Sequence, residues 1–127
     1  EDRAQGIPPT SESQIRSWLD KLLVDDCINV VGWHEELPIG HALLVPDGQG
    51  AFELAIFVLG EYQNAGIGTE LIQGLLGAGR ADGVEYVWLT VERWNKPAIA
   101  LYRKVGFVPT DDGSFELEMA TKLLEDD

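Results

Sequence analysis

The stretch between residues 52 and 92 most constrains the fold, because two apolar runs flank a glycine-rich turn and an amphipathic segment. Phe52 to Leu59 (FELAIFVL) and Tyr86 to Glu92 (YVWLTVE) have the length and the β-branched and aromatic content of strands. Residues 66–81 carry apolar side chains at three- and four-residue spacing, which predicts a helix. A strand, a helix and a strand in this order predict a pair of neighbouring parallel strands.

The rest of the chain predicts antiparallel strands and further helices, because the connections are short. Turn signals (PDGQG and DDGS) separate strands, and Gly83 and Gly106 suit the ends of helices. The other expected elements are helices over 10–24 and 95–104 and strands over 28–33, 37–45, 107–109 and 115–121. The expected fold class is α/β (α+β), with one mixed central sheet and flanking helices in a single domain.

The charge of the chain is strongly negative, since 22 acidic and 9 basic residues give a net charge of -13. A field of this sign repels nucleic acid and anionic membrane surfaces, so neither is an expected partner. It favours a cationic substrate, although acidic residues also serve solubility. The few lysines and many acids resemble the composition of proteins from salt-loving organisms; an ordinary acidic protein is the alternative.

Cys27 is the only cysteine, which excludes an internal disulfide and a cysteine metal cluster. We expect Cys27 to be a core residue and the protein to be cytoplasmic. No apolar run approaches the length of about 18 residues that a membrane-spanning helix needs.

The glycine-rich turn, QNAGIG at residues 63–68, predicts a phosphate site at the start of the following helix. Glycines expose backbone N–H groups, and a helix N-terminus carries partial positive charge. A nucleotide P-loop would need a lysine after Gly68, where Thr69 stands, and a dinucleotide fingerprint would need a glycine at position 71, which is leucine. Two interpretations remain, a coenzyme A pyrophosphate site built from backbone amides and a purely structural turn.

A second segment, WNKPAIALYRKVGF at residues 94–107, follows the next strand. Together the two segments resemble the GNAT superfamily of N-acetyltransferases over about residues 37–107. Gln63, Gly66 and Gly68 match the first family pattern of Gln or Arg, two residues, then Gly-x-Gly. The second pattern is matched by Asn95, Ala98, Tyr102, Gly106 and Phe107.

The resemblance implies acetyl-CoA as co-substrate and no metal. It implies that the backbone of Ile56, Phe57 and Val58 pairs with the pantetheine arm where the parallel strands splay. Asn95 corresponds to a residue that hydrogen-bonds the cofactor near the mouth of the binding site. The implied pyrophosphate loop is Gln63, Asn64, Ala65, Gly66, Ile67, Gly68 and Thr69, and the cations that could meet the 3′-phosphate are Lys96, Arg103 and Lys104.

The implied reaction is direct attack of a primary amine on the acetyl thioester, with Tyr102 as the general acid for the departing thiolate. The strand backbone near Val58 would stabilise the oxyanion. The glutamates that serve as base in other members do not carry over, so Glu92, Glu53, His41 and a relayed water all stay open as proton acceptors. The alternative function is a non-catalytic domain that senses coenzyme A or acyl-CoA, or serves as an interaction module.

The expected partner is a small-molecule or peptide amine, and a homodimer is left open. The family usually opens with a strand and two helices that form one wall of the acceptor pocket. This chain shows one helix there and no first strand. We therefore expect residues 1–127 to form one acetyltransferase domain that lacks its N-terminal strand.

Overall fold

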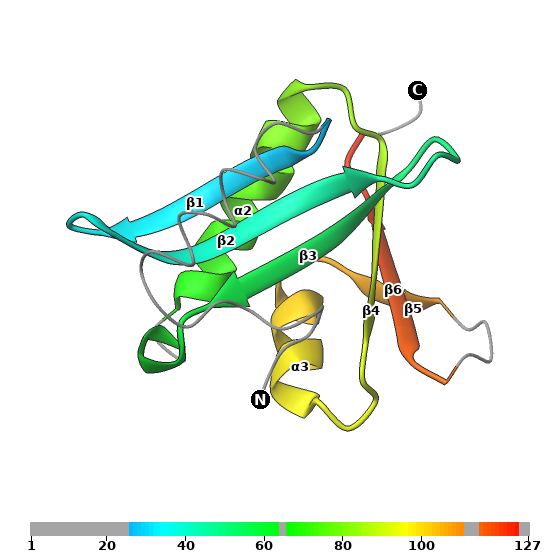
Figure 1. Ribbon diagram of the computed structural model, residues 1–127. Helices are drawn as coiled ribbons and strands as arrows, with labels where there is room; N and C mark the ends of the chain where they lie inside the picture. The colour runs from blue at the N-terminus through cyan, green and yellow to red at the C-terminus, as the bar shows by residue number, and fades with distance from the viewer. Residues whose placement is uncertain (1–25, 64–65, 111–114, 125–127) are drawn as a thin grey trace.

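The computed structural model describes residues 26–63, 66–110 and 115–124 of the 127-residue chain (Figure 1). The helix predicted over residues 10–24 lies outside the described residues. The elements are β1 (Ile28–His34), β2 (Leu37–Pro46), β3 (Phe52–Val58), a 3₁₀ turn η1 (Gly60–Tyr62), α2 (Ile67–Ala81), β4 (Tyr86–Val91), α3 (Lys96–Lys104), β5 (Val108–Thr110) and β6 (Leu117–Lys122).

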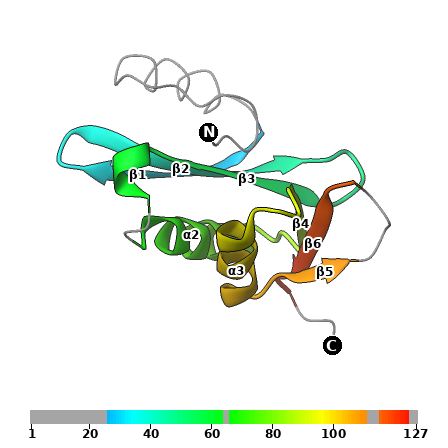
Figure 2. The same ribbon diagram turned by 90° about the horizontal axis from the view of Figure 1, so that it is seen from below.

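The described strands form one six-stranded mixed sheet in the order β1-β2-β3-β4-β6-β5. Among the described strands, only β3 and β4 are parallel, and the other neighbours are antiparallel. Helix α2 makes the crossover between β3 and β4, and α2 and α3 lie on the same face of the sheet (Figure 2). The predicted fold class and the predicted parallel pair are both confirmed.

The core lies between α2 and the sheet, and two glycines set how closely they approach. A Cβ atom at Gly40 of β2 would stand 2.7 Å from Cδ1 of Leu71, and one at Gly79 of α2 would stand 2.9 Å from Cδ1 of Leu44. The apolar stripe of α2 that faces the sheet consists of Leu71, Ile72, Leu75 and Leu76, all buried. The low intrinsic stability of a glycine-rich helix is therefore offset by close packing.

Both described helices end where the sequence predicts, at glycines with positive φ. Gly83 has φ 87° and Gly106 has φ 111°. The N–H of Val84 donates to the carbonyl of Gly79 at 2.9 Å, and the N–H of Phe107 donates to the carbonyl of Tyr102 at 2.9 Å. These six-to-one bonds satisfy terminal carbonyls that would otherwise lack partners.

Several predicted boundaries need correction. Phe107 follows the capping glycine into the core and is 1% exposed, so β5 begins at Val108. Phe115 is 95% exposed and precedes β6, which begins at Leu117. His34 extends β1 by one residue beyond the strand predicted over 28–33. Cys27 is half-buried just before β1 and is not a core residue, contrary to expectation.

Candidate active site

The strands β3 and β4 separate soon after they begin. Their parallel ladder contains two pairs among the described residues, Phe52 with Val87 and Glu53 with Trp88. Strand β3 meanwhile stays paired with β2 as far as Val58, and the N–H of Leu59 donates to the carbonyl of Ile39 at 2.8 Å. A gap between two strands therefore opens beyond the pair Glu53–Trp88.

The hydrogen-bonding direction of β3 decides which main-chain groups face this gap. Bonding to an antiparallel neighbour alternates along a strand, and Leu59 bonds toward β2. Phe57, opposite His41, therefore also directs its N–H and C=O toward β2, whereas Ile56 and Val58 direct theirs toward β4. Of the three strand residues expected to hold the pantetheine arm, two present main-chain groups to the gap.

Gln63 contacts the end of β3 with its side chain. Its Nε2 donates to the carbonyl oxygen of Val58 at 3.1 Å, and its own N–H donates to the carbonyl of Gly60 at 3.2 Å. Gln63 therefore joins the 3₁₀ turn to the strand end, a link that the sequence pattern did not reveal.

Helix α2 begins beside this strand end, and among the described residues no side chain caps its first amide groups. Its N-cap Gly66 has φ 80° and supplies no side-chain cap, and the first intrahelical bond runs from the N–H of Glu70 to the Gly66 carbonyl. Ile67, Gly68 and Thr69 thus begin the helix with amides ahead of that bond. Such a start is suited to an anion. Asn64 and Ala65 lie outside the described residues.

Gly68 brings three elements of the site together. A Cβ atom on Gly68 would stand 3.2 Å from Cδ2 of Leu101 in α3 and 3.9 Å from Cδ1 of Ile56 in β3. By contrast, a Cβ on Gly66 would have no atom within 4 Å. Gly66 is therefore required by its backbone conformation and Gly68 by the close approach of its neighbours.

Tyr102 lies on α3, whose first residues follow β4. Its ring packs edge-to-face on Phe107, with centroids 6.0 Å apart and an interplanar angle of 64°. Tyr102 is 8% exposed, and burial raises the pKa of its phenol to about 12. Within the described part of the chain its hydroxyl has no hydrogen-bond partner. The phenol is therefore neutral at physiological pH and free to donate to a ligand.

Asn95, expected to contact the cofactor, is the N-cap of α3. Its Oδ1 accepts a hydrogen bond from the N–H of Ala98 at 3.3 Å. This bond occupies the side-chain oxygen and leaves the Nδ2 amide group for a ligand. Helix capping is a sufficient reason for an asparagine at this position.

The basic residues near α3 divide into two groups. Arg93 donates from Nε to the carbonyl of Phe115 at 3.2 Å and from Nη2 to that of Glu116 at 3.4 Å, so it ties the end of β4 to the start of β6. Arg103 and Lys104 are exposed in the last turn of α3, where positive charge also complements the helix dipole.

The three side chains expected as candidate proton acceptors differ in burial and in their surroundings. Glu53 is half-buried, and burial, followed by the charges of Asp47 and Glu116, raises the pKa of its carboxyl. Glu92 is exposed immediately after β4. His41 is 2% exposed, its Nε2 lies 2.6 Å from Oδ1 of Asn29, and burial lowers its pKa to about 4.

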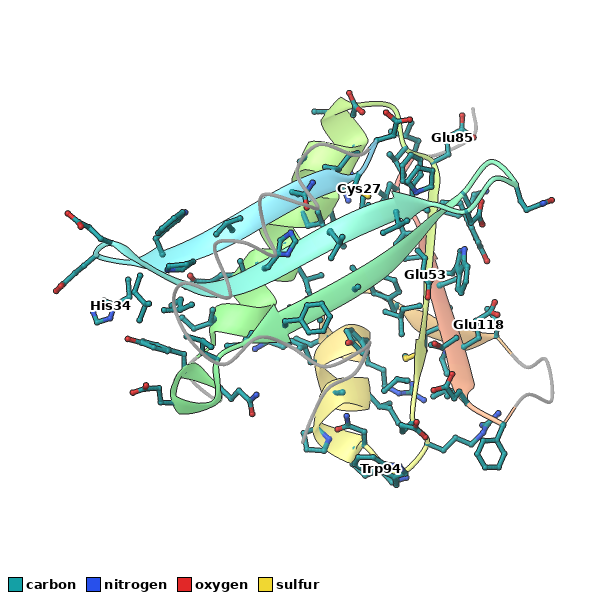
Figure 3. The ribbon with its side chains drawn as sticks, in the orientation of Figure 1. Cys27, His34, Glu53, Glu85, Trp94 and Glu118 are labelled. Atoms are coloured by element: carbon teal, nitrogen blue, oxygen red, sulfur yellow. The ribbon has the colours of Figure 1, made fainter. Side chains whose placement is uncertain are left out.

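The side chains of Glu53 and its partner Trp88 point to the face of the sheet opposite the helices. Their neighbours along the strands, Leu54 and Val87, belong to the buried core on the helix side, and side chains alternate along a strand. Glu53 comes from β3 and Glu118 from β6, the two strands that flank β4, and Trp94 lies beyond the end of β4, before α3 (Figure 3).

Two side-chain contacts near the site could not be predicted from the sequence. Nε1 of Trp88 donates to Oδ2 of Asp47 at 2.9 Å, across 41 residues of chain. Nδ1 of His34 lies 2.7 Å from the hydroxyl of Tyr62, with the rings edge-to-face at 5.5 Å. His34 thus joins the β1–β2 hairpin to η1. No local sequence signal predicts either pair, because both depend on long-range packing.

The described residues contain no group of three or more His, Cys, Asp or Glu side chains arranged to hold a metal ion. Within the same ranges, no helix combines the length and apolar character required to cross a bilayer.

A gap between two strands that meets a helix N-terminus without a side-chain cap suits an extended ligand with an anionic group. The model of the acetyltransferase (GNAT) family matches residues 2–107 of this chain. The chain therefore belongs to the GNAT acetyltransferase family.

Individual relatives agree with this assignment. An N-alpha-acetyltransferase from Sulfurisphaera tokodaii is 44% identical over 55 residues, which are 42% of this chain and 33% of the relative. The matched part thus spans about a third, 30% to 34%, of the length of the curated relatives.

Two solved structures show the same fold. The ribosomal-protein-S18-alanine N-acetyltransferase from Escherichia coli has a TM-score of 0.74 at 22% identity, covering 98% of this chain and 84% of that one. YncA from Salmonella typhimurium, solved with acetyl-CoA, has a TM-score of 0.73 at 20% identity, covering 94% and 78%. At these identities the likeness concerns the fold.

Proposed function

We propose that this protein transfers the acetyl group of acetyl-CoA to a primary amine by direct attack. The observation that carries the proposal is the gap between β3 and β4, which meets the uncapped start of α2 and has Tyr102 on the neighbouring helix. A cytoplasmic protein acting on a small-molecule or peptide amine accords with this function. No metal is required by the chemistry.

In this proposal the cofactor takes the place of a missing strand. The main-chain groups of Ile56 and Val58 that face the gap bind the pantetheine amides, as a parallel neighbour would. The amides at Ile67, Gly68 and Thr69 receive the pyrophosphate with support from the helix dipole. Arg103 and Lys104 are the exposed cations for the 3′-phosphate.

The chemistry follows from the same groups. The neutral amine attacks the thioester carbonyl, and a main-chain N–H of β3 in the gap stabilises the tetrahedral oxyanion. The C–S bond then breaks, and Tyr102 donates to the departing sulfur. Because burial raises its pKa to about 12, Tyr102 is a strong hydrogen-bond donor in its neutral form but a weak acid toward a thiolate.

The proton of the attacking amine needs an acceptor. Glu92 is exposed beyond the end of β4, whereas Glu53 lies at the end of the parallel ladder with a raised pKa. We propose that one of these two carboxylates accepts the proton, directly or through water. His41 is a poorer candidate, because Asn29 already occupies its Nε2 and the ring is buried.

A second function is favoured by one observation. The raised pKa of Tyr102 weakens it as an acid, which suits a domain that binds acyl-CoA without turning it over. Such a domain would be a sensor or an interaction module.

Thiol release from acetyl-CoA in the presence of a panel of primary amines separates the two functions. We expect amine-dependent release and an increase in melting temperature with acetyl-CoA. Tyr102→Phe removes the hydroxyl and keeps the packing on Phe107. We expect kcat to fall about 10- to 100-fold with little change in melting temperature. Stabilisation by acetyl-CoA without turnover of any amine would favour the sensor, and equal turnover by Tyr102→Phe would remove its assigned role.

A further inference from the structure

The face of the sheet opposite the helices carries an aromatic ring at the point where β3 and β4 part. Trp88 is half-buried and forms the last pair of the parallel ladder with Glu53. Its other sheet neighbour is Ala120 of β6, which is buried. The ring therefore lies at the closed end of the gap into which the acetyl arm would extend.

Asp47 fixes this ring in place. Its Oδ2 accepts from Nε1 of Trp88 at 2.9 Å, while its Oδ1 accepts from the N–H of Gln49 at 2.7 Å and of Ala51 at 3.1 Å. The bonds to the turn and to the indole lower the pKa of Asp47, so the carboxylate is charged at neutral pH. One carboxylate thus holds the β2–β3 turn with one oxygen and the indole with the other.

We propose that Trp88, positioned by Asp47, binds a second cationic group of the acceptor and so selects amines that carry two positive charges. This inference rests on the proposed acetyl transfer and extends it to the acceptor class. Asp47 acts through Trp88 and is a positioning residue. The reacting amine must lose its proton, whereas the second cation keeps its charge on the indole.

The electrostatics of the surrounding side chains favour this assignment. Indole is the aromatic ring that attracts cations most strongly. Burial, followed by the negative charges of Asp47 and Glu116, raises the pKa of the Glu53 carboxyl, so these three carboxyl groups lie close enough to repel one another. Within the described residues, none of the three forms an ion pair. A ligand cation would relieve this repulsion.

A matched pair of acceptors tests the proposal. Butylamine and 1,4-diaminobutane differ by one ammonium group. For the wild-type protein we expect a KM about tenfold lower for the diamine, as a desolvated cation–π contact near carboxylates provides. Trp88→Leu should raise the diamine KM to that of butylamine and leave the KM for acetyl-CoA unchanged. Tyr86→Leu is the control, because Tyr86 is 38% exposed two residues away on the same face.

Asp47→Asn keeps an oxygen for the turn amides but removes the acceptor for the indole N–H. When Trp88 is present, we expect Asp47→Asn to raise the KM for the diamine about threefold. It should have no effect in a Trp88→Phe background, where the N–H is absent. An equal effect in both backgrounds would assign Asp47 to the turn alone and overturn its positioning role. Equal KM values for the two amines would overturn the acceptor class.

A binding measurement separates this inference from acetyl transfer itself. The indole N–H resonance of Trp88 is identified by its loss in Trp88→Phe. Titration with 1,4-diaminobutane should shift this resonance, and butylamine should shift it much less. A shift without acetylation would support the site while contradicting the proposed reaction. Acetylation of the diamine without a shift would overturn the site.

Discussion

Gly68 of α2 and Leu101 of α3 are in direct apposition: a Cβ atom on Gly68 would lie 3.2 Å from Cδ2 of Leu101. This distance is shorter than ordinary van der Waals contact, so α2 could not start where it does with a larger residue unless Leu101 moved. The same glycine contributes an amide to the proposed pyrophosphate site. Packing against Leu101 and the proposed ligand binding therefore both favour glycine at position 68.

Gly68→Ala should therefore weaken acetyl-CoA binding through packing. The new methyl group displaces either Leu101 or the first turn of α2, and we expect the Kd for acetyl-CoA, measured by calorimetry, to rise about three- to tenfold. Gly68→Ala combined with Leu101→Ala should recover most of the affinity, because the second change makes room. Gly77→Ala is the control, since a Cβ there has no atom within 4 Å. An unimproved double variant would show that the methyl group blocks the ligand itself.

The two carboxylate candidates should separate by pH profile. Glu53→Gln removes a group whose pKa is raised by burial and by the charges of Asp47 and Glu116. If Glu53 is the base, kcat/KM of the wild type rises with pH as this carboxyl ionises. Glu53→Gln should then lose this rising part of the pH profile, and its kcat/KM should be about 100-fold lower. Glu92→Gln should then keep the profile. The reverse result would assign the role to Glu92.

Although ionised Glu53 would support catalysis, its charge should lower the stability of the folded protein. Because its pKa is higher in the folded protein, its ionisation opposes folding, and this penalty grows as pH rises through the folded pKa. Glu53→Gln should thus have a higher melting temperature than wild type at pH 7. The difference should vanish below the ordinary glutamate pKa of about 4.3, where both states are protonated. A lower melting temperature at pH 7 would show that the charge is stabilised by its surroundings.

His41 should make the fold sensitive to acid. Its pKa is lowered from 6.5 to about 4, so between these values the unfolded chain binds a proton that the folded protein excludes. Stability from this residue is complete above the unfolded pKa and is lost as pH falls. Urea unfolding should show a loss of about 2 kcal/mol from pH 7 to pH 5 relative to His41→Gln, which cannot titrate. Parallel pH dependence of the two proteins would contradict the prediction.

The exposed cations of α3 should recognise the 3′-phosphate. Arg103→Ala, alone or with Lys104→Ala, should raise the KM for acetyl-CoA about tenfold and leave that for 3′-dephospho acetyl-CoA unchanged. Lys96→Ala tests the first turn of the same helix, where Lys96 is also exposed. An equal loss with both cofactors would indicate that the cations act through the net charge of the protein.

The order of elements and the fold class were predictable from local patterns. Apolar periodicity identified β3, α2 and β4. Gly83 and Gly106 predicted where both described helices end, because glycine lacks a Cβ atom and adopts a positive φ at little cost. The motif around QNAGIG also predicted the strand end and helix start. Family membership over residues 2–107 confirmed the resemblance.

The arrangement of the site depended on tertiary structure. Which main-chain groups of β3 face the gap follows from pairing with β2, and the length of the gap follows from where β4 leaves the ladder. The bond between Asp47 and Trp88 joins residues 41 positions apart, and that between His34 and Tyr62 joins residues 28 apart. Sequence alone determined which segments become strands, helices and turns, because these choices are local. Only the folded sheet decided which side chains meet, because register and strand separation arise from contacts across the chain.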